Sequence, residues 1–234
     1  MPTRYRIVVV QRITRFPDDD KAQFIKDRRG DARDPNFQCS VTIPLHTMDW
    51  SQLPKIKTSR LMLRRISHED VDALFGIFSN VEVMRYWSTP PLPDRDAAVA
   101  LVNEIHDAFE RQFMMKWGVA TRADNVLIGT TTLFNLDFTN RRAELGYALG
   151  REHWGRGYMH EALQALLTYC FETLNMRRLE ADVDPRNEAS IQTLERLGFQ
   201  REGFLRERWE VGGEIQDALF YGLLRPEWKR NDRN

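Results

Sequence analysis

The stretch "LGREHWGRGYMHEAL" (Leu149–Leu163) places two glycines, Gly155 and Gly157, on either side of an arginine and directly before an apolar helical pattern. Glycine adopts backbone angles that other residues avoid and lets the main chain approach a bulky group. The first turn of the following helix offers unpaired N–H groups and the positive end of the helix dipole, which favour an anion such as a phosphate. The stretch therefore predicts a site for a cofactor that carries a diphosphate.

Two common nucleotide-binding motifs do not fit this stretch. A P-loop needs the spacing G-x-x-x-x-G-K-[ST], which the sequence lacks. A dinucleotide fingerprint needs a third glycine at the position that His160 occupies. It also needs an acidic strand end at the right distance to hold a ribose, and the sequence has none there. The diphosphate is therefore expected to belong to another kind of cofactor.

The composition sets broad limits on the kind of protein. The chain has 234 residues, of which 42% are apolar and 29% charged, as expected for a soluble globular protein. The 34 basic residues balance the 34 acidic ones, so the net charge favours neither nucleic acid nor membrane as a partner. Cys39 and Cys170 allow at most one disulfide and give no metal-binding pattern, and Cys170 is expected to be a reduced thiol inside a helix. Since no apolar run is long enough to span a membrane, we expect a cytoplasmic protein. Because the cysteines give no metal-binding pattern, we also expect no metal.

Residues 1–47 differ in composition from the rest of the chain. They contain no glutamate and one leucine, against nine lysines or arginines and six aspartates. No helical or strand period runs through them, so they cannot bury enough apolar surface to fold alone. We expect residues 1–47 to form a poorly ordered or accessory extension and residues 48–234 to form the folded domain. An alternative is that the extension is not normally translated, because Met48 begins a stretch that runs directly into the first strand.

The remaining chain shows clear helix and strand patterns, with Ser67 and Asp70 spaced as a capping box. Strands are predicted over residues 61–66, 116–121, 125–136, 142–150 and 177–184. Helices are predicted over residues 67–78, 94–113, 159–174 and 185–199. A hairpin that turns at Gly212–Gly213 is predicted over residues 200–224. The order of these elements indicates an α/β domain with one mixed sheet and no internal repeat.

The sequence from "AELGYALG" through "REHWGRGYM", "HEALQALLTYCFETL", "RRLEADVD" and "NEASIQTLERLGFQREG" resembles the GCN5-related N-acetyltransferase (GNAT) family. Within that family it is similar to the ribosomal-protein N-terminal acetyltransferase branch, the RimJ/RimL type. The resemblance extends from Thr58 to Trp228. It implies a mixed α/β sheet with splayed central strands and helices on both faces. It also implies acetyl-CoA as co-substrate, an amine acceptor on a protein N-terminus or a small molecule, and a monomer or homodimer.

The family signature [QR]-x-x-G-x-[GA] wraps the pyrophosphate of acetyl-CoA with main-chain N–H groups. The matching residues are Trp154, Gly155, Arg156, Gly157, Tyr158 and Met159. Trp154 and Met159 depart from the first and last positions, but the W-G-x-G-Y form is usual in the branch, and main-chain ligands tolerate side-chain changes. The resemblance adds Leu149, at the end of a splayed strand, and Asn187, whose amide contacts the pantetheine arm in the family. Asparagine is also a good helix N-cap, so Asn187 fits both roles.

Attack of an amine on a thioester requires a neutral amine, so a carboxylate is needed to take its proton directly or through water. Glu144 is the first candidate, because family enzymes often use a glutamate on this strand. A strand carboxylate without a catalytic role is the alternative interpretation. Glu210 is a second candidate, although the glutamate position of the branch on that strand falls on Trp209.

The leaving thiolate needs a hydrogen-bond or proton donor. Many family members carry a tyrosine seven residues after the asparagine, where this sequence has Leu194. The alternative in the branch is a serine three residues after the asparagine, and Ser190 matches it. We therefore expect Ser190 to donate a hydrogen bond to the leaving sulfur. Neither motif contains a cysteine, which favours direct transfer to the amine.

The aromatic pair Tyr86 and Trp87 falls where the family lines its acceptor pocket, although aromatic residues at such positions also fit a core role. A second class of function also fits the sequence. The chain would then be a module that binds coenzyme A but has lost catalysis, as suggested by Trp209 and by the missing tyrosine.

Overall fold

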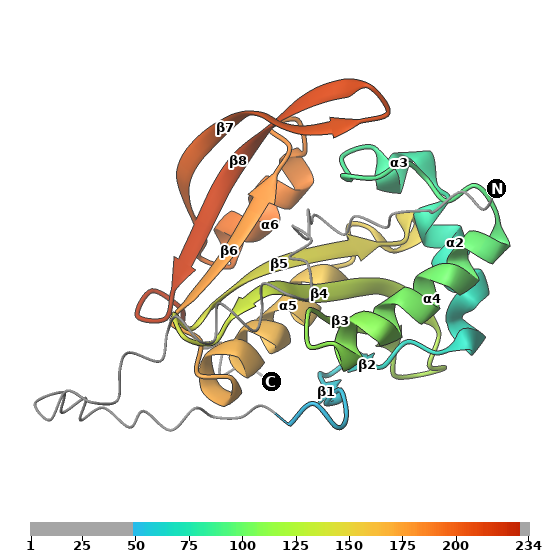
Figure 1. Ribbon diagram of the computed structural model, residues 1–234. Coiled ribbons are helices and arrows are strands. Elements are labelled where there is room, and N and C mark those ends of the chain that lie inside the picture. The colour runs from blue at the N-terminus through green and yellow to red at the C-terminus, as the bar shows by residue number, and fades with distance from the viewer. Residues whose placement is uncertain (1–48, 230–234) are drawn as a thin grey trace, which may run out of the picture. The chain divides into compact units, whose positions relative to one another are not determined.

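The computed structural model describes residues 49–229 (Figure 1). The extension proposed for residues 1–47, its boundary at residue 48 and Cys39 lie outside the described residues. The described chain forms one eight-stranded sheet in the order β1-β2-β3-β4-β5-β6-β8-β7. Its strands are β1 (Ile56–Lys57), β2 (Leu61–Arg64), β3 (Met115–Thr121), β4 (Leu127–Asp137), β5 (Arg142–Leu149), β6 (Arg178–Val183), β7 (Gln200–Val211) and β8 (Glu214–Leu224). Its helices are η1 (His68–Asp70), α2 (Val71–Phe78), α3 (Val81–Met84), α4 (Arg95–Glu110), η2 (Arg151–His153), α5 (Tyr158–Thr168), η3 (Tyr169–Thr173) and α6 (Glu188–Arg196).

The helices cover both faces of the sheet, as the sequence predicts (Figure 1). One apolar cluster joins α5, η3 and α6 to the sheet and includes the buried Trp117, Leu163 and Tyr221. The other joins α2 and α4 to the opposite face and includes Leu74 and Phe134. Successive side chains along a strand point to opposite faces of the sheet, so the same strands contribute residues to both clusters. Cys170 lies in the first cluster as a free, fully buried cysteine.

Local signals in the sequence account for several element boundaries. The capping box at Ser67 and Asp70 is present, and the Ser67 N–H donates to the Asp70 carboxylate at 2.8 Å. Arg64 at the end of β2 donates to the same carboxylate at 2.8 Å, which fixes how the strand leads into the helix. Gly198 follows α6 with a φ of +95°, as expected for a glycine at a helix C-terminus.

The structure differs from the sequence prediction at several elements, four of which stand out. The helix predicted over 94–113 ends at Glu110, and the helix predicted over 159–174 changes to the π-helix η3 at Tyr169. Strand β1 was not predicted, because two residues are too few to show a period. Helix α3 was not predicted either; it has four residues and is capped by Asn80, whose Oδ1 accepts from the N–H groups of Glu82 and Val83.

Strands β5 and β6 separate in the middle of the sheet, as in the expected splayed fold. They are parallel and pair at three positions, of which the last joins Glu144 to Glu180. Strand β5 continues to Leu149 and remains paired with β4, while β6 continues to Val183 and remains paired with β8. The facing edges of β5 and β6 therefore diverge, and their N–H and C=O groups are left for another partner.

Candidate active site

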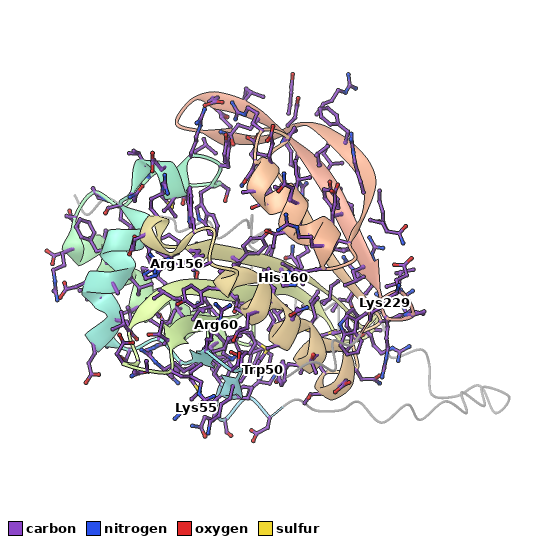
Figure 2. The ribbon with its side chains drawn as sticks, turned by 180° about the vertical axis from the view of Figure 1, so that it is seen from behind. Trp50, Lys55, Arg60, Arg156, His160 and Lys229 are labelled. Carbon is purple, nitrogen blue, oxygen red and sulfur yellow. The ribbon has the colours of Figure 1, made fainter. Side chains whose placement is uncertain are left out.

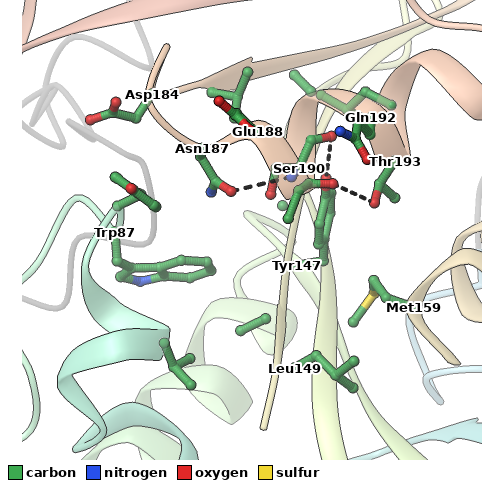
Figure 3. A pocket seen from close by; sticks show the side chains of 18 of the residues that line it. Trp87, Tyr147, Leu149, Met159, Asp184, Asn187, Glu188, Ser190, Gln192 and Thr193 are labelled. Carbon is green, nitrogen blue, oxygen red and sulfur yellow. Dashed lines mark hydrogen bonds between the residues drawn. The ribbon is translucent and has the colours of Figure 1, made fainter. Parts of the chain in front are cut away.

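A cavity of about 830 Å³ opens between the diverging strands (Figure 3). Its walls come from the ends of β5 and β6, the loop before α5, the first turns of α5 and α6, and the segment that follows α3. The splay thus produces a cleft with two unpaired strand edges on its sides and two helix N-termini beside it.

The loop before α5 has the backbone that its glycines predict. Gly155 and Gly157 have φ values of +72° and +73°, in the left-handed region that favours glycine. Gly157 is the N-cap of α5 and supplies no side-chain cap, so the first N–H groups of α5 lack partners within the helix. A Cβ at Gly155 would meet no atom within 4 Å, so it is the backbone angle that requires glycine there. The loop can therefore present main-chain N–H groups to an anion.

Trp154 holds the start of this loop. Its indole N–H donates to the Leu149 carbonyl at 2.7 Å, and the guanidinium of Arg151 lies 4.8 Å from its ring centroid. The tryptophan therefore joins the end of β5 to the loop. This contact gives a structural role to the residue that departs from the family signature.

The structure places most of the sequence-predicted cofactor residues on the cavity wall. The lining includes Leu149, Trp154, Gly155, Gly157, Tyr158, Met159 and Asn187. Arg156 is exposed and is not part of the lining, although its carbonyl accepts a hydrogen bond from Arg60 at 3.0 Å.

The first turn of α6 brings Asn187 and Ser190 to the cavity (Figure 3). Asn187 is the N-cap, and its Oδ1 accepts from the Ser190 N–H at 3.2 Å. The Asn187 side-chain NH₂ is then the group that can donate to a ligand. Leu194, which stands at the family's tyrosine position, is buried in the apolar cluster.

Tyr147 is a cavity residue that sequence reasoning missed. It lies on β5, and its hydroxyl donates to the Ser190 carbonyl at 3.3 Å. Burial raises the pKa of Tyr147 to about 12, so the phenol is neutral and a donor at neutral pH. The period of two along β5 was the available signal, because it places Tyr147 on the same face of the strand as Leu145 and the predicted cofactor residue Leu149.

Besides Glu180, which forms ion pairs with Arg142 and Arg178, two carboxylates lie near the point where the strands separate. Asp182 on β6 lines the cavity, and its Oδ2 lies 3.3 Å from Nε of Arg208. Burial raises the pKa of Asp182, although Arg208 and Trp209 oppose the shift. Glu144 on β5 is half-buried, is not part of the cavity lining, and accepts from the Asn135 amide at 2.8 Å. Burial raises the pKa of Glu144, and the nearby charges of Asp182 and Glu180 add to the shift.

Strand β7 bulges beside these carboxylates. Leu205 lies opposite Ala218 and Trp209 opposite Gln216, so β7 has three residues between these pairs where β8 has one. The bulge brings Trp209 to the cavity wall, whereas Glu210 is exposed and is not in the lining. Counting along β7 from the sequence could not anticipate this irregularity.

Acidic side chains outnumber basic ones along the cavity. The acidic residues in the lining are Glu82, Asp182, Asp184, Glu188 and Asp217, and the basic ones are Arg186 and Arg196. Three of these acids have an arginine partner: Asp184 pairs with Arg186 at 2.7 Å, Asp182 with Arg208 at 3.3 Å and Glu82 with Arg151 at 2.6 Å. The lining keeps a small excess of negative charge, which favours a positively charged ligand in this part of the site.

Tyr86 and Trp87 also line the cavity, on the segment after α3. The Trp87 ring packs against Phe78 with ring centroids 5.8 Å apart. The Arg186 guanidinium lies 5.8 Å from the Tyr86 ring centroid and so links this segment to the loop before α6. Trp87 therefore has both a core contact and a cavity-facing surface.

Within residues 49–229, no group of three or more His, Cys, Asp or Glu side chains is arranged to hold a metal ion. No helix in the same range is long and apolar enough to cross a membrane.

The model of the acetyltransferase (GNAT) domain matches residues 60–200. The chain belongs to the GNAT family. An uncharacterized N-acetyltransferase of Bacillus licheniformis is 37% identical over 171 residues, covering 73% of this chain and 96% of that protein. A Bacillus subtilis protein named "Putative ribosomal N-acetyltransferase YdaF" is 40% identical over 106 residues, covering 45% of this chain and 58% of that protein. The spermidine N-acetyltransferase of Vibrio cholerae, solved in complex with CoA and spermine, has a TM-score of 0.64 and 25% identity, covering 73% of this chain and 98% of that one.

As a GNAT enzyme, the chain is an acetyl-CoA-dependent N-acetyltransferase. The diverging edges of β5 and β6 leave main-chain groups with which an extended ligand can pair, as in strand addition. The left-handed glycines and the first N–H groups of α5 present main-chain donors that can bind an anion.

Proposed function

We propose that the enzyme acetylates a primary amine on a small molecule that carries more than one positive charge, such as a polyamine. The observation that carries this proposal is the acidic cavity lining around Asp182 and Asp217. A cavity wall with excess negative charge attracts a cationic acceptor and holds its distal ammonium group while another amine reacts. The spermidine acetyltransferase among the similar structures supports an acceptor of this class.

The cofactor side of the proposal assigns the diphosphate to the loop from Trp154 to Met159. Main-chain N–H groups of Gly155, Gly157 and the first turn of α5 would hold its oxygens. The strand edge that ends at Leu149 and the amide of Asn187 would hold the pantetheine arm. Acetyl-CoA supplies an acyl group already activated as a thioester.

The chemistry that remains for the protein is proton transfer. We propose that Glu144 takes the amine proton through a water molecule, because it stands at the point where β5 and β6 separate but outside the cavity lining. Its raised pKa brings it closer to that of a useful base at neutral pH. Asp182, which lines the cavity, would hold the cationic acceptor. Ser190, with Tyr147 beside it, would donate to the leaving sulfur. Cys170 is fully buried in the apolar cluster, so direct transfer is proposed rather than an acetylated cysteine.

A second candidate acceptor is the N-terminal amine of a protein. It is favoured by the W-G-x-G-Y loop of the ribosomal-protein acetyltransferase branch and by the similar B. subtilis protein. In either case we propose a cytoplasmic monomer or homodimer whose acceptor is neither nucleic acid nor a membrane component.

A screen of acceptors with the purified full chain tests the proposal. Release of the coenzyme A thiol is measured with spermidine, a neutral-tailed monoamine of similar length, and a short peptide with a free N-terminus. We expect the highest kcat/KM with spermidine, and a loss of that preference as salt is raised. Equal rates with the monoamine would contradict the cationic acceptor, and preference for the peptide would favour the second candidate. Coenzyme A binding without turnover on any amine would indicate a module without catalysis.

A further inference from the structure

Arg60 lies in the turn between β1 and β2 and contacts the loop from Trp154 to Met159, called the diphosphate loop below. Its Nη1 donates to the Arg156 carbonyl at 3.0 Å, and its Nε lies 2.6 Å from Oε2 of Glu161. Its guanidinium carbon lies 4.6 Å from the centroid of the Tyr158 ring. Figure 2 labels Arg60 and Arg156, which lie near each other beside α5. One side chain thus contacts three residues in and just after the loop.

The contact with Arg156 falls between the two left-handed glycines. The Arg156 carbonyl belongs to the segment from Gly155 to Gly157, where both glycines have positive φ. A Cβ at Gly155 would meet no atom within 4 Å, whereas a Cβ at Gly157 would meet the Arg60 guanidinium at 3.6 Å. The hydrogen bond from Arg60 therefore fixes the carbonyl that lies between the two left-handed glycines.

Glu161 is the second partner and lies in the first turn of α5. Its carboxylate accepts from the Thr58 hydroxyl at 2.5 Å, the Ser59 hydroxyl at 3.0 Å and the Arg60 N–H at 2.9 Å. Burial alone would raise the pKa of Glu161, but these hydrogen bonds and the one from the Arg60 side chain lower it overall. Glu161 is therefore a carboxylate at neutral pH.

This carboxylate stands beside the anion site at the helix N-terminus. A negative charge in the first turn repels a diphosphate that must bind to the same N–H groups. The Arg60 guanidinium, with its Nε 2.6 Å from the Glu161 carboxylate, offsets that charge. Its third contact, over Tyr158, holds it against the loop.

We propose that Arg60 is a positioning residue for coenzyme A, which fixes the diphosphate loop through the Arg156 carbonyl and neutralises Glu161. The inference rests on the proposed placement of the diphosphate in the loop from Trp154 to Met159. Arginine suits the role because its planar guanidinium makes hydrogen bonds in two directions while stacking on a ring, which a lysine cannot do.

The test is the binding of coenzyme A to the full chain, measured by calorimetry, together with KM and kcat. We expect Arg60→Ala to raise both the Kd for coenzyme A and the KM for acetyl-CoA about tenfold or more, as for a lost hydrogen bond to a charged group. The kcat at saturating acetyl-CoA should stay within about twofold, because Arg60 touches neither the thioester nor the amine. Arg60→Lys should restore only part of the affinity.

A double variant separates neutralisation from a general structural role. Adding Glu161→Gln to Arg60→Ala removes the uncompensated charge, so the double variant should bind coenzyme A several-fold more tightly than Arg60→Ala alone. The matched control is Arg95→Ala. Arg95 lies on α4, is also exposed, and has its Nε 2.6 Å from the carboxylate of Asp72. Arg95→Ala should leave coenzyme A binding unchanged.

Gly157→Val separates failure of this inference from failure of the site itself. If Gly157→Val loses coenzyme A binding and Arg60→Ala binds as tightly as the wild type, the role of Arg60 is wrong and the loop assignment stands. If both variants bind normally, the loop assignment is wrong and the inference falls with it. Should Arg60→Ala fail to fold, Arg60→Lys carries the test, and wild-type affinity in it would overturn the inference.

Discussion

Glu144 of β5 lies opposite Glu180 of β6 in the last parallel pair before the two strands separate. The next acid along β6 is Asp182, which lines the cavity, and its charge adds to the burial that raises the pKa of Glu144. The site therefore begins where the sheet stops pairing, with Glu144 at that point and Asp182 on the cavity wall. Substitution can assign their two roles separately.

Glu144→Gln should lower kcat by about 10²–10⁴, because the amide keeps the shape but cannot accept the amine proton. The deficit in kcat should shrink as pH rises toward the pKa of the amine, since solvent then supplies the neutral amine.

Asp182→Asn should instead raise the KM for a polycationic amine and change kcat little. Steady-state kinetics from pH 6 to 10 checks both expectations. Glu110→Gln, at the exposed end of α4 and outside the cavity lining, is the matched control. A large loss of kcat in Asp182→Asn with a normal Glu144→Gln enzyme would make Asp182 the base.

Ser190→Ala should lower kcat about tenfold, because one hydrogen bond to a developing charge is worth roughly 1.5–3 kcal/mol at most. The loss should be independent of pH, because neither the serine hydroxyl nor the Tyr147 phenol, with a pKa of about 12, titrates between pH 6 and 10. Tyr147→Phe keeps the ring and removes the bond to the Ser190 carbonyl. Pre-steady-state rates of thiol release compare the two variants. A larger loss in Tyr147→Phe would move the role of thiol donor from Ser190 to Tyr147.

The sequence predicted the elements whose signals are local. The left-handed glycines, the cap at Ser67 and the hairpin turn at Gly212–Gly213 follow from backbone preferences, and the structure has all three. The sheet order and splay came from resemblance to a family, because strand pairing over long sequence distances leaves little local trace.

The side-chain environment of the site was less predictable. Tyr147 is brought to α6 by the fold, although the two are far apart in sequence, and Trp209 reaches the wall through a bulge that no periodicity reveals. Arg60 and Glu161 are in contact although 101 positions separate them in the sequence. Such pairs depend on tertiary packing, and a single sequence carries no direct signal of it.

Tyr86→Ala and Trp87→Ala should raise the KM for the amine and leave the KM for acetyl-CoA nearly unchanged. Both residues line the cavity on the segment after α3 and are not part of the loop assigned to the diphosphate. Initial rates with each substrate varied in turn give the two constants. Since Trp87 also packs on Phe78, Trp87→Phe serves as the control that keeps an aromatic ring in the core. Equal increases in both KM values would mean that the two residues only support the fold.

A shortened chain that begins at Met48 should fold and bind coenzyme A as the full chain does. The expectation follows from the composition of residues 1–47 and from the first strand, which begins at Ile56. Thermal unfolding with and without coenzyme A measures both properties, because a ligand that binds the native state raises Tm. Loss of solubility or of the ligand-induced rise would show that the extension belongs to the folded domain.

Lys116→Met should stabilise the protein at pH 7 and lose that advantage in alkali. Lys116 lies on β3, is 3% exposed, and has its Nζ 5.1 Å from the Phe78 ring centroid. Burial lowers the pKa of Lys116 from 10.5 to about 8, so at pH 7 the native state holds a buried charge that the unfolded state would rather solvate. This pKa shift corresponds to a free-energy cost on the order of 3 kcal/mol for keeping Lys116 charged in the native state. Lys116→Met removes that cost, and poorer packing of the methionine reduces the gain in stability.

The sign of the pH dependence follows from proton binding. Between pH 8 and 10.5 the unfolded state binds more protons at Lys116 than the native state, so the wild type gains stability as pH rises. Below pH 8 both states are protonated and the cost is constant. The stability difference between Lys116→Met and the wild type should therefore be largest near pH 7 and fall toward zero or reverse near pH 10.5. Urea unfolding at both pH values measures it, with the exposed Lys57→Met as the matched control. A variant that is less stable than the wild type by the same amount at both values would mean that the Lys116 ammonium is well accommodated in the native protein.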